Sequence, residues 1–298
     1  MRVLILGGSG MLGHKVYQFF KERFDTYTTL RRSRSEQSKL SLYRDSARVI
    51  EGIDAMDFER VRLVIDNVKP AVIVNCIGVI KQLDEAQDAV RLITLNSLFP
   101  HRLAAAASSI GSRLIHVSTD CVFSGRKGQY SEADLADPPD LYGQSKLLGE
   151  LRRSNCLTIR TSVIGRDLTK NAGLLEWFIS QRGKSVKGYV NSIYSGFPTQ
   201  ALAEILVFVV ERQPDLQGLY HVASNPISKY ELLVRIRDAM NLDIEVERFE
   251  NSFCDRSLDG QRFITATQYQ IHSWEEMISQ IAGDTTPYDQ WKYEITAA

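Results

Sequence analysis

Tyr142 and Lys146 stand four residues apart, in a stretch that reads Tyr-Gly-Gln-Ser-Lys. Side chains at positions i and i+4 of a helix share one face, so the Lys146 ammonium is expected beside the Tyr142 phenol, where it would stabilise the ionised form. A phenol whose pKa is lowered in this way can donate a proton near neutral pH. The pair, downstream of Ser118-Thr119-Asp120, therefore indicates acid catalysis.

A glycine motif near the N-terminus indicates where a cofactor would bind. Gly7, Gly10 and Gly13 follow an apolar run and precede an amphipathic stretch. Glycines between a strand and a helix let the backbone approach a pyrophosphate, whose charge is met by N–H groups at the helix start. Together with the Tyr-Lys pair, the motif predicts a dinucleotide and a redox reaction.

The residues after the second predicted strand distinguish between the two nicotinamide dinucleotides. NAD sites commonly place a carboxylate against the adenosine ribose, whereas NADP sites place cations against its 2′-phosphate. Here Arg31 and Arg32 follow Leu30, and residues 30–34 contain no acid. NADPH is therefore favoured over NAD as the cofactor.

The elements that must position these residues alternate along the first half of the chain. Strands separated by helices form a parallel sheet that is covered on both faces, so the predicted fold class is α/β, a doubly wound (Rossmann) sheet. The polar segment 31–45 is expected to be a mobile loop at the cofactor edge. Strands are expected at 2–6, 26–30, 71–76, 113–117 and 156–160, and helices at 11–21, 58–67, 86–109 and around Tyr142.

After Gly165 the alternation becomes less regular, which indicates a smaller C-terminal lobe. Ser228 is the expected N-cap of a helix at 228–240, and Glu231 would complete a capping box. Further helices are expected at 171–181, 199–211 and 272–281, and strands at 218–222 and 244–249. We assign 1–165, about 199–224 and about 262–283 to an NADP-binding domain, and about 166–198, 225–261 and 284–298 to a substrate-binding lobe.

Composition narrows the classes of function. The 36 basic residues balance 36 acidic ones, so no overall charge favours nucleic acid or an anionic membrane as a partner. The apolar runs are too short for a membrane span or a signal peptide, and we expect a cytoplasmic protein. The four cysteines lack metal-ligand spacing, which favours reduced thiols over zinc or disulfides.

The whole chain resembles the extended short-chain dehydrogenase/reductases, and within them the dTDP-4-dehydrorhamnose reductase-like family of nucleotide-sugar reductases. The C-terminal part matches only loosely. The motifs that carry the resemblance are the glycine turn 7–13 and residues 75–78, 96, 118–125, 130–132, 142–146, 149–150, 160–162, 196–199 and 218–222.

This resemblance implies a reaction. Tyr142 would donate a proton to a substrate carbonyl oxygen while hydride passes from the nicotinamide to its carbon. Lys146 would bind the nicotinamide ribose, Thr119 would polarise the carbonyl, and Asn96 would brace the active-site strand and helix. The implied cofactor contacts are Gly7, Ser9, Gly10, Met11, Leu12, Gly13, Arg31, Arg32, Asp54, Ala55, Asn75, Cys76, Ile77, Tyr142, Lys146, Ser162 and Val163.

The implied substrate is a nucleotide-diphosphate sugar, specifically a nucleotide-linked 4-keto-6-deoxy sugar used for polysaccharide or glycoside precursors. Because a diphosphate needs cations, basic residues enter the expected substrate contacts. These contacts are Val79, Lys81, Asp120, Val122, Lys184, Lys187 and Arg256.

Departures from the wider family narrow the reaction. Relatives that eliminate water follow the threonine with Asp-Glu, whereas here Asp120 is followed by Cys121, which argues against dehydration. Some relatives bind magnesium through glutamates at a dimer contact. This chain has His14 after the glycine turn, so those ligands are not carried over; no metal is predicted, and a homodimer stays open.

Two alternatives to a reductase remain. The first, within the same superfamily, is a nucleotide-sugar epimerase or a bifunctional epimerase-reductase. The second is a non-catalytic NADP-binding regulatory subunit, because one branch of the resembled family uses this fold to regulate a partner enzyme. The intact set of Thr119, Tyr142 and Lys146 favours catalysis.

Overall fold

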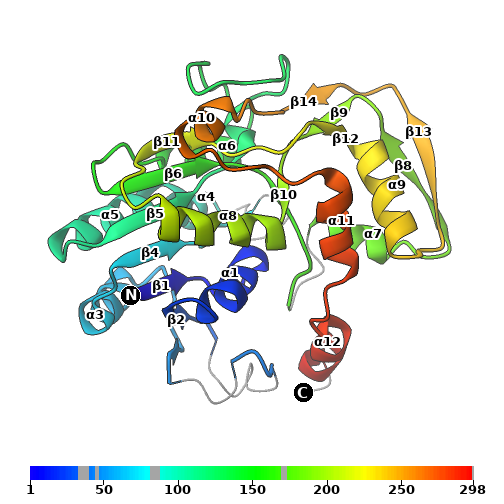
Figure 1. Cartoon of the computed structure of the whole chain (residues 1–298). Coiled ribbons are helices and arrows are strands. Elements are labelled where there is room, and N and C mark those ends of the chain that lie inside the picture. Colours follow the sequence, from blue (N-terminus) through cyan, green and yellow to red (C-terminus); the bar gives the residue numbers. More distant parts are fainter. Residues whose placement is uncertain (33–39, 44–46, 81–87, 169–172, 297–298) are drawn as a thin grey trace.

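A computed structural model describes residues 1–32, 40–43, 47–80, 88–168 and 173–296 and contains a seven-stranded parallel sheet (Figure 1). The strand order reverses direction at β1, which has β2 on one side and β4 on the other. In open α/β sheets, ligands bind at such switch points. The predicted doubly wound fold is therefore confirmed. The strands in spatial order are β11 (Gly218–His221), β6 (Cys156–Arg160), β5 (Arg113–Val117), β4 (Val72–Asn75), β1 (Arg2–Leu6), β2 (Asp25–Thr29) and β3 (Val49–Ile50).

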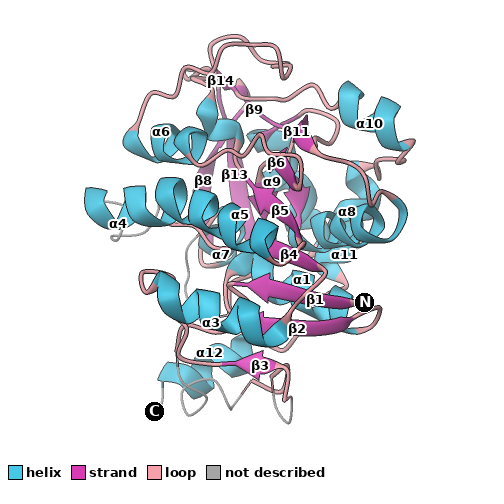
Figure 2. Cartoon of the chain, turned by 90° about the vertical axis from the view of Figure 1, so that its left-hand side faces the viewer, coloured by secondary structure: helices cyan, strands magenta, loops and turns pink. Residues whose placement is uncertain are grey.

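Apolar side chains project from both faces of this sheet, because successive residues of a strand point in opposite directions. Val3 and Ile5 of β1 belong to one apolar cluster, and Leu4 and Leu6 belong to the other. Each cluster needs a helical layer to exclude water, and Figure 2 shows the strands enclosed between such layers.

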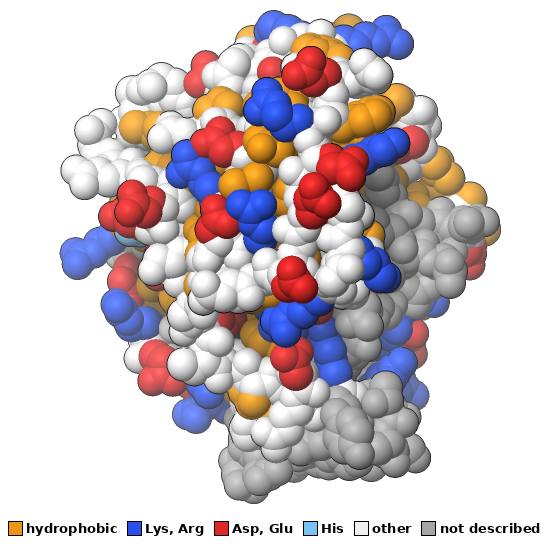
Figure 3. Space-filling view, turned by 90° about the vertical axis from the view of Figure 1, so that its right-hand side faces the viewer, with side chains coloured by type: hydrophobic (Ala, Val, Ile, Leu, Met, Phe, Trp, Pro, Cys, Tyr) orange, Lys and Arg blue, Asp and Glu red, His pale blue; other side chains and the backbone are white. Residues whose placement is uncertain are grey.

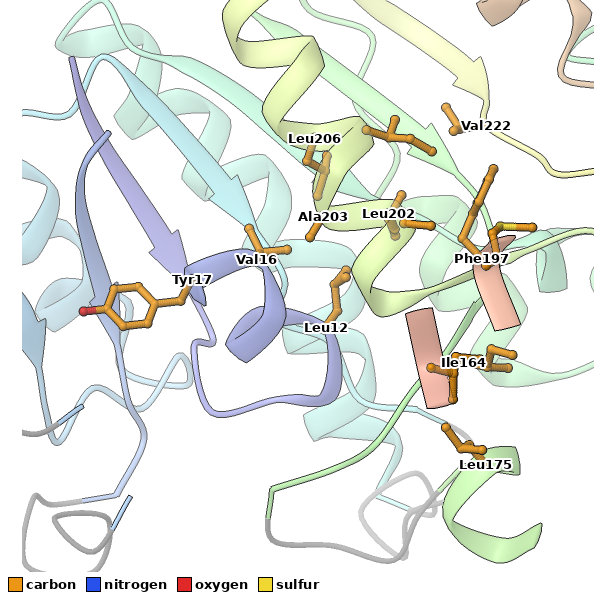
Figure 4. Packing of buried hydrophobic residues seen from close by; sticks show 14 of the residues in the cluster. Leu12, Val16, Tyr17, Ile164, Leu175, Phe197, Leu202, Ala203, Leu206 and Val222 are labelled. Atoms are coloured by element: carbon orange, nitrogen blue, oxygen red, sulfur yellow. The ribbon is translucent and has the colours of Figure 1, made fainter. Parts of the chain in front are cut away.

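The first cluster is covered by α1 (Met11–Lys21) and α8 (Thr199–Arg212), and the second by α3 (Phe58–Val68) and α5 (Phe99–Ser109). Figure 4 shows how α1 and α8 pack together across the first face. The side chains in that contact are Leu12, Val16, Leu202, Ala203 and Leu206.

The helix predicted at 86–109 contains a π-helical turn. It begins as α4 (Ala89–Ile93), widens to a π turn at Thr94–Leu98 and continues as α5, whereas 86 and 87 lie outside the described residues. Pro100 has no N–H, so the carbonyl of Asn96 cannot receive the usual helical hydrogen bond from it. The wider turn leaves the Asn96 side chain fully buried.

A smaller lobe lies beyond the carboxyl ends of the strands of the large sheet (Figure 1). In it β8 (Lys184–Tyr189) pairs with β13 (Ile244–Phe249), β9 (Ser192–Tyr194) lies between β12 (Ile227–Ser228) and β14 (Cys254–Asp255), and β7 (Val163–Ile164) pairs with β10 (Phe197–Pro198). Its helices are α7 (Leu174–Ile179) and α9 (Lys229–Ala239). Across the described residues, no helix combines the length and apolarity needed to span a membrane.

Capping differs in one respect from the prediction. Ser228 caps α9, as predicted, by accepting a hydrogen bond from the Glu231 N–H at 3.0 Å. The Glu231 carboxylate pairs with Arg235, so no capping box forms there. The capping box is instead at Ser273 and Glu276, at the start of α11 (Trp274–Ala282).

The bounds of other elements also differ from the prediction. Helix α7 is shorter than the predicted 171–181, of which 171 and 172 are not described, and α6 (Leu141–Leu148) carries the Tyr-Lys pair as predicted. Of the polar segment 31–45, residues 33–39 and 44–45 lie outside the described residues, but Leu40, Leu42 and Tyr43 are buried. The Tyr43 hydroxyl donates to the Gly8 carbonyl at 2.5 Å, which ties this stretch to the glycine turn.

Candidate active site

A cavity of about 520 Å³ opens where the carboxyl ends of the large sheet meet the smaller lobe. Its walls come from the glycine turn, the segments after β2, β4, β5 and β6, the helix α6 and the lobe residues around Tyr194 and Arg256. Most of the residues predicted for the cofactor, and all three predicted for catalysis, line this single space.

The glycine turn forms a cradle without side chains at the cavity wall. Gly7 has a φ of 84°, which favours glycine, and a Cβ atom at Gly13 would lie 2.0 Å from the Gly7 carbonyl oxygen. Gly10 is the N-cap of α1, and no side chain caps this helix. The first N–H groups of α1 thus lack intrahelical partners beside the cavity, a setting that suits a pyrophosphate.

The far end of the cavity suits the adenosine half of a dinucleotide. Arg31, Arg32, Asp54 and Ala55 all line it. Asp54 also accepts a hydrogen bond from the N–H of Met56 at 3.0 Å, which fixes its carboxylate at the cavity edge. Two guanidinium groups here supply the positive charge that a 2′-phosphate requires.

Behind this wall, Asn75 is fully buried and does not line the cavity. Its side chain bonds His116 Nδ1 at 3.1 Å and accepts from the Ile77 N–H at 3.1 Å, so it supports the backbone of residues that do line the cavity. Cys76 is one of these, and burial raises the pKa of its thiol to about 12, which keeps the thiol neutral.

Thr119, Tyr142 and Lys146 approach one another because α6 packs closely on the segment after β5. Thr119 caps a short 3-10 helix at Asp120–Val122, and its hydroxyl oxygen accepts from the Cys121 N–H at 3.1 Å. The Thr119 hydroxyl donates to the Asp120 carboxylate at 3.0 Å, and the Lys146 ammonium donates to the Val117 carbonyl at 2.7 Å. The Tyr142 phenol and the Thr119 hydroxyl therefore both line the cavity, with the Thr119 hydroxyl held by Asp120.

Burial controls the charges of this trio. It raises the pKa of Tyr142 far above its ordinary value, an effect that Cys121 reinforces and the Thr119 hydroxyl opposes. The predicted lowering of the Tyr142 pKa is wrong for the protein alone, because burial outweighs the groups that favour the ionised phenol. Burial also lowers the pKa of Lys146 to about 8, although Glu150 favours its charged form.

Asn96 braces this arrangement from the π turn. Its amide donates to the Val79 carbonyl at 3.0 Å and to Ser145 Oγ at 3.1 Å, and its oxygen accepts from the Val79 N–H at 2.9 Å. One buried side chain thus links the cavity wall to α6 at Ser145, the residue directly before Lys146. Ser162 and Val163, after β6, line the same region.

The smaller lobe contributes two basic side chains to the cavity, Arg256 and Lys229. Arg256 lines it and donates from Nε to the Phe123 carbonyl at 2.9 Å. Lys229, the first residue of α9, also lines it and was not predicted; its place directly after the N-cap Ser228 was the available signal. Burial raises the pKa of the nearby Asp120, whereas Thr119 and Arg256 act in the opposite direction.

The other predicted substrate residues differ in position. Val79 and Asp120 line the cavity, whereas Val122 is fully buried in an apolar cluster with Phe123, and Lys81 lies outside the described residues. The structure thus brings only part of the predicted set together.

Lys184 and Lys187 are exposed on β8 and do not line the cavity. Lys187 points away from the face that Val186 and Gly188 bury, whereas Lys184 is exposed as the first residue of the strand. Lys187 instead lies over the Phe249 ring, 4.5 Å from its centre. On the side of the molecule that carries this lobe, basic and acidic side chains are interspersed (Figure 3).

The cavity is also lined by residues that no sequence motif identified as part of a site. Asp167, Gly173, Leu174, Ile193, Tyr194 and Cys254 line it, and they come from loops, short strands and the start of α7. Among the described residues, no group of three or more His, Cys, Asp or Glu side chains is arranged to hold a metal ion.

Comparison with known proteins places this arrangement in a family. The chain is 28% identical over 254 residues to methionine adenosyltransferase 2 subunit beta of Xenopus laevis, covering 81% of this chain and 72% of that one. It is 26% identical over 253 residues to the spore coat polysaccharide biosynthesis protein SpsK of Bacillus subtilis, covering 82% and 81%.

A solved structure has the same fold. The dTDP-4-dehydrorhamnose reductase of Bacillus anthracis, in complex with NADP, superimposes with a TM-score of 0.76 at 21% identity, over 94% of this chain and 98% of that one. The sequence model of the family described as "RmlD substrate binding domain" matches residues 1–282. The chain therefore belongs to the RmlD substrate-binding domain family of extended short-chain dehydrogenase/reductases.

Proposed function

We propose that this chain is an NADPH-dependent reductase of a nucleotide-linked 4-keto-6-deoxy sugar. The observation that carries the proposal is the convergence of Thr119, Tyr142 and Lys146 on the cavity that also contains the glycine turn. A protein that only bound a dinucleotide would need the glycine turn but not a partly buried phenol with a threonine hydroxyl on the same cavity. The likeness to SpsK supports a role in making polysaccharide precursors.

The cofactor would lie along the cavity wall. The N–H groups at the start of α1 would meet its pyrophosphate, and Arg31 and Arg32 would meet its 2′-phosphate. Ser162 and Val163 would lie at the nicotinamide end, where the bound cofactor supplies the hydride. The similar fold of a reductase in complex with NADP supports this choice of cofactor.

The chain's own residues would control the proton. The raised pKa of Tyr142 keeps its phenol protonated at neutral pH, so its proton is available when a carbonyl oxygen gains negative charge. The phenol O–H bond breaks, a bond from that proton to the substrate oxygen forms, and the sugar gains a hydroxyl. Lys146, charged below about pH 8, would stabilise the phenolate that remains, and Thr119 would orient the carbonyl.

The lobe side of the cavity suits a diphosphate. Arg256 and Lys229 face it from two different elements and together offer two positive charges to one anion. Water elimination needs both an acid and a base beside the threonine, but here Asp120 is followed by Cys121, so the second carboxyl group of such a pair is missing. This chemistry supports reduction rather than dehydration.

Turnover with a panel of keto sugars linked to dTDP, UDP, GDP and CDP tests the proposal. We expect loss of NADPH absorbance with at least one of them, and the nucleotide that works identifies the substrate class. Conversion of the sugar without net loss of NADPH would indicate an epimerase instead.

A second candidate function is a non-catalytic binding subunit. It is favoured by the likeness to a protein named as the beta subunit of methionine adenosyltransferase 2. Tight NADPH binding with no conversion of any sugar in the panel would support it against the reductase proposal.

A further inference from the structure

The segment after Gly283 continues beyond the family match, which ends at residue 282, and it is firmly attached to the rest of the molecule. It contains α12 (Tyr288–Thr296), whose Tyr288 and Trp291 are only 2% and 3% exposed and belong to the same apolar cluster as α1 and α8. The segment is therefore packed into the main apolar cluster of the fold.

Tyr288 reaches the glycine turn through His14, the fourth residue of α1. The Nδ1 atom of the fully buried His14 lies 2.9 Å from the Gly10 carbonyl oxygen, and its Nε2 atom lies 2.8 Å from the Tyr288 hydroxyl. Burial lowers the pKa of His14 to about 4, so the ring is neutral. Because a carbonyl only accepts, Nδ1 carries the ring proton, and the unprotonated Nε2 is an acceptor for the Tyr288 hydroxyl, which also lies 3.1 Å from the Asp284 carboxylate.

This chain of hydrogen bonds ends on the part of the turn that a phosphate would contact. The Gly10 carbonyl and the Met11 N–H belong to one planar peptide unit, so the direction of one fixes the direction of the other. Met11 is the first residue of α1, where N–H groups lack an intrahelical partner, and it lines the cavity. A hydroxyl from the end of the chain thereby orients a phosphate-binding N–H.

A second set of contacts ties the same segment to the neighbouring cavity wall. Lys15, only 3% exposed, contacts the Asp284 carboxylate at 2.7 Å and Thr286 Oγ1 at 2.8 Å. Lys292 pairs with Glu176 at 2.5 Å, and Glu176 accepts from the N–H of Asp167, a cavity-lining residue, at 2.9 Å. The segment therefore contacts both α1 and Glu176, whose carboxylate holds the backbone of a residue that lines the cavity.

We infer that residues 284–292 act as a strap that positions the pyrophosphate-binding peptide of the cofactor site, with Tyr288 and His14 as positioning residues. The inference rests on the proposed binding of a dinucleotide in this cavity. The strap acts on the pyrophosphate, which NADPH and NADH share, so its loss weakens both cofactors equally. Loss of Arg31 affects the 2′-phosphate alone.

The Kd values of NADPH and NADH, measured by fluorescence titration on the full chain, test the inference. Tyr288→Phe removes the hydroxyl that contacts both the buried His14 ring and the Asp284 carboxylate, and we expect both Kd values to rise by about 3- to 10-fold with their ratio unchanged. Ile281→Val is the control: it removes packing from the same apolar cluster but lies in α11, outside the strap, so it should lower Tm and leave both Kd values unchanged.

His14→Leu provides an independent variant should Tyr288→Phe fold poorly. It should raise both Kd values to a similar extent, and adding Tyr288→Phe to it should cause no further loss, because the two residues act in series. Unchanged Kd values in either single variant, or independent effects that multiply in the double variant, would overturn the strap alone. An unmodified protein that binds neither dinucleotide would overturn the proposed cofactor site as well.

Discussion

The backbone of Gly143 lies directly against the carbonyl oxygen of Cys121, where an added Cβ atom would come within 2.3 Å of it. This close approach lets α6 bring Tyr142 to Thr119. We expect Gly143→Ala to push the helix away and to reduce kcat by about tenfold or more, since small displacements of catalytic groups are costly. Steady-state kinetics measure the effect.

The control for this variant is Gln144→Ala, at an exposed position of the same helix. It should leave kcat unchanged. If Gly143→Ala is as active as the control, the close contact does not position the phenol.

Replacing Tyr142 by Phe removes the proton donor while the ring continues to pack. Turnover should fall by about 10²- to 10⁴-fold, the usual contribution of a positioned acid, whereas the Kd of NADPH should change little. Single-turnover kinetics and fluorescence titration separate the two effects. Full activity of this variant would mean that the proton comes from another group.

The pH profile of kcat/KM should decline above about pH 8. Burial lowers the pKa of Lys146 to about 8, so the ammonium is charged below that pH and becomes neutral as the pH rises through it. Lys146→Arg keeps its charge at every pH in the range. Whatever activity this variant retains should therefore persist to higher pH, and an identical alkaline decline in both proteins would assign the titration to another group.

Cofactor preference should depend on the two arginines that line the adenosine end. Charge-assisted contacts to a phosphate contribute roughly 1.5–3 kcal/mol each, so NADPH should bind clearly tighter than NADH. The double variant Arg31→Ala, Arg32→Ala should lose most of that difference, because NADH binding does not involve the 2′-phosphate. Equal Kd values for both cofactors in the unmodified protein would contradict the preference.

Local sequence patterns predicted much of the fold. The glycine turn and the Tyr-Lys spacing depend on residues close together in the chain, and both lie on the predicted elements. The predicted roles of these site residues, like the division of the chain between two domains, stay predictions. The capping box of α11 was missed although its pattern, Ser273 followed by Glu276, is local.

Features that depend on distant contacts could not be predicted in this way. The π turn is held by bonds from Asn96 to Val79 and Ser145, which lie far away in the sequence. The raised pKa of Tyr142 results from burial that only the assembled fold provides. Charge alone made Lys187 a candidate, whereas the alternation of β8 turns it away from the cavity.

The most direct test of the account is the fate of the nicotinamide hydrogen. With NADPH deuterated at the transferable position of the nicotinamide and a keto-sugar nucleotide that reacts, we expect one NADPH to be consumed for each sugar reduced. The product should carry deuterium on the carbon that bears the new hydroxyl, as shown by mass spectrometry and NMR. Product without deuterium, or conversion without net loss of NADPH, would contradict the proposed reductase.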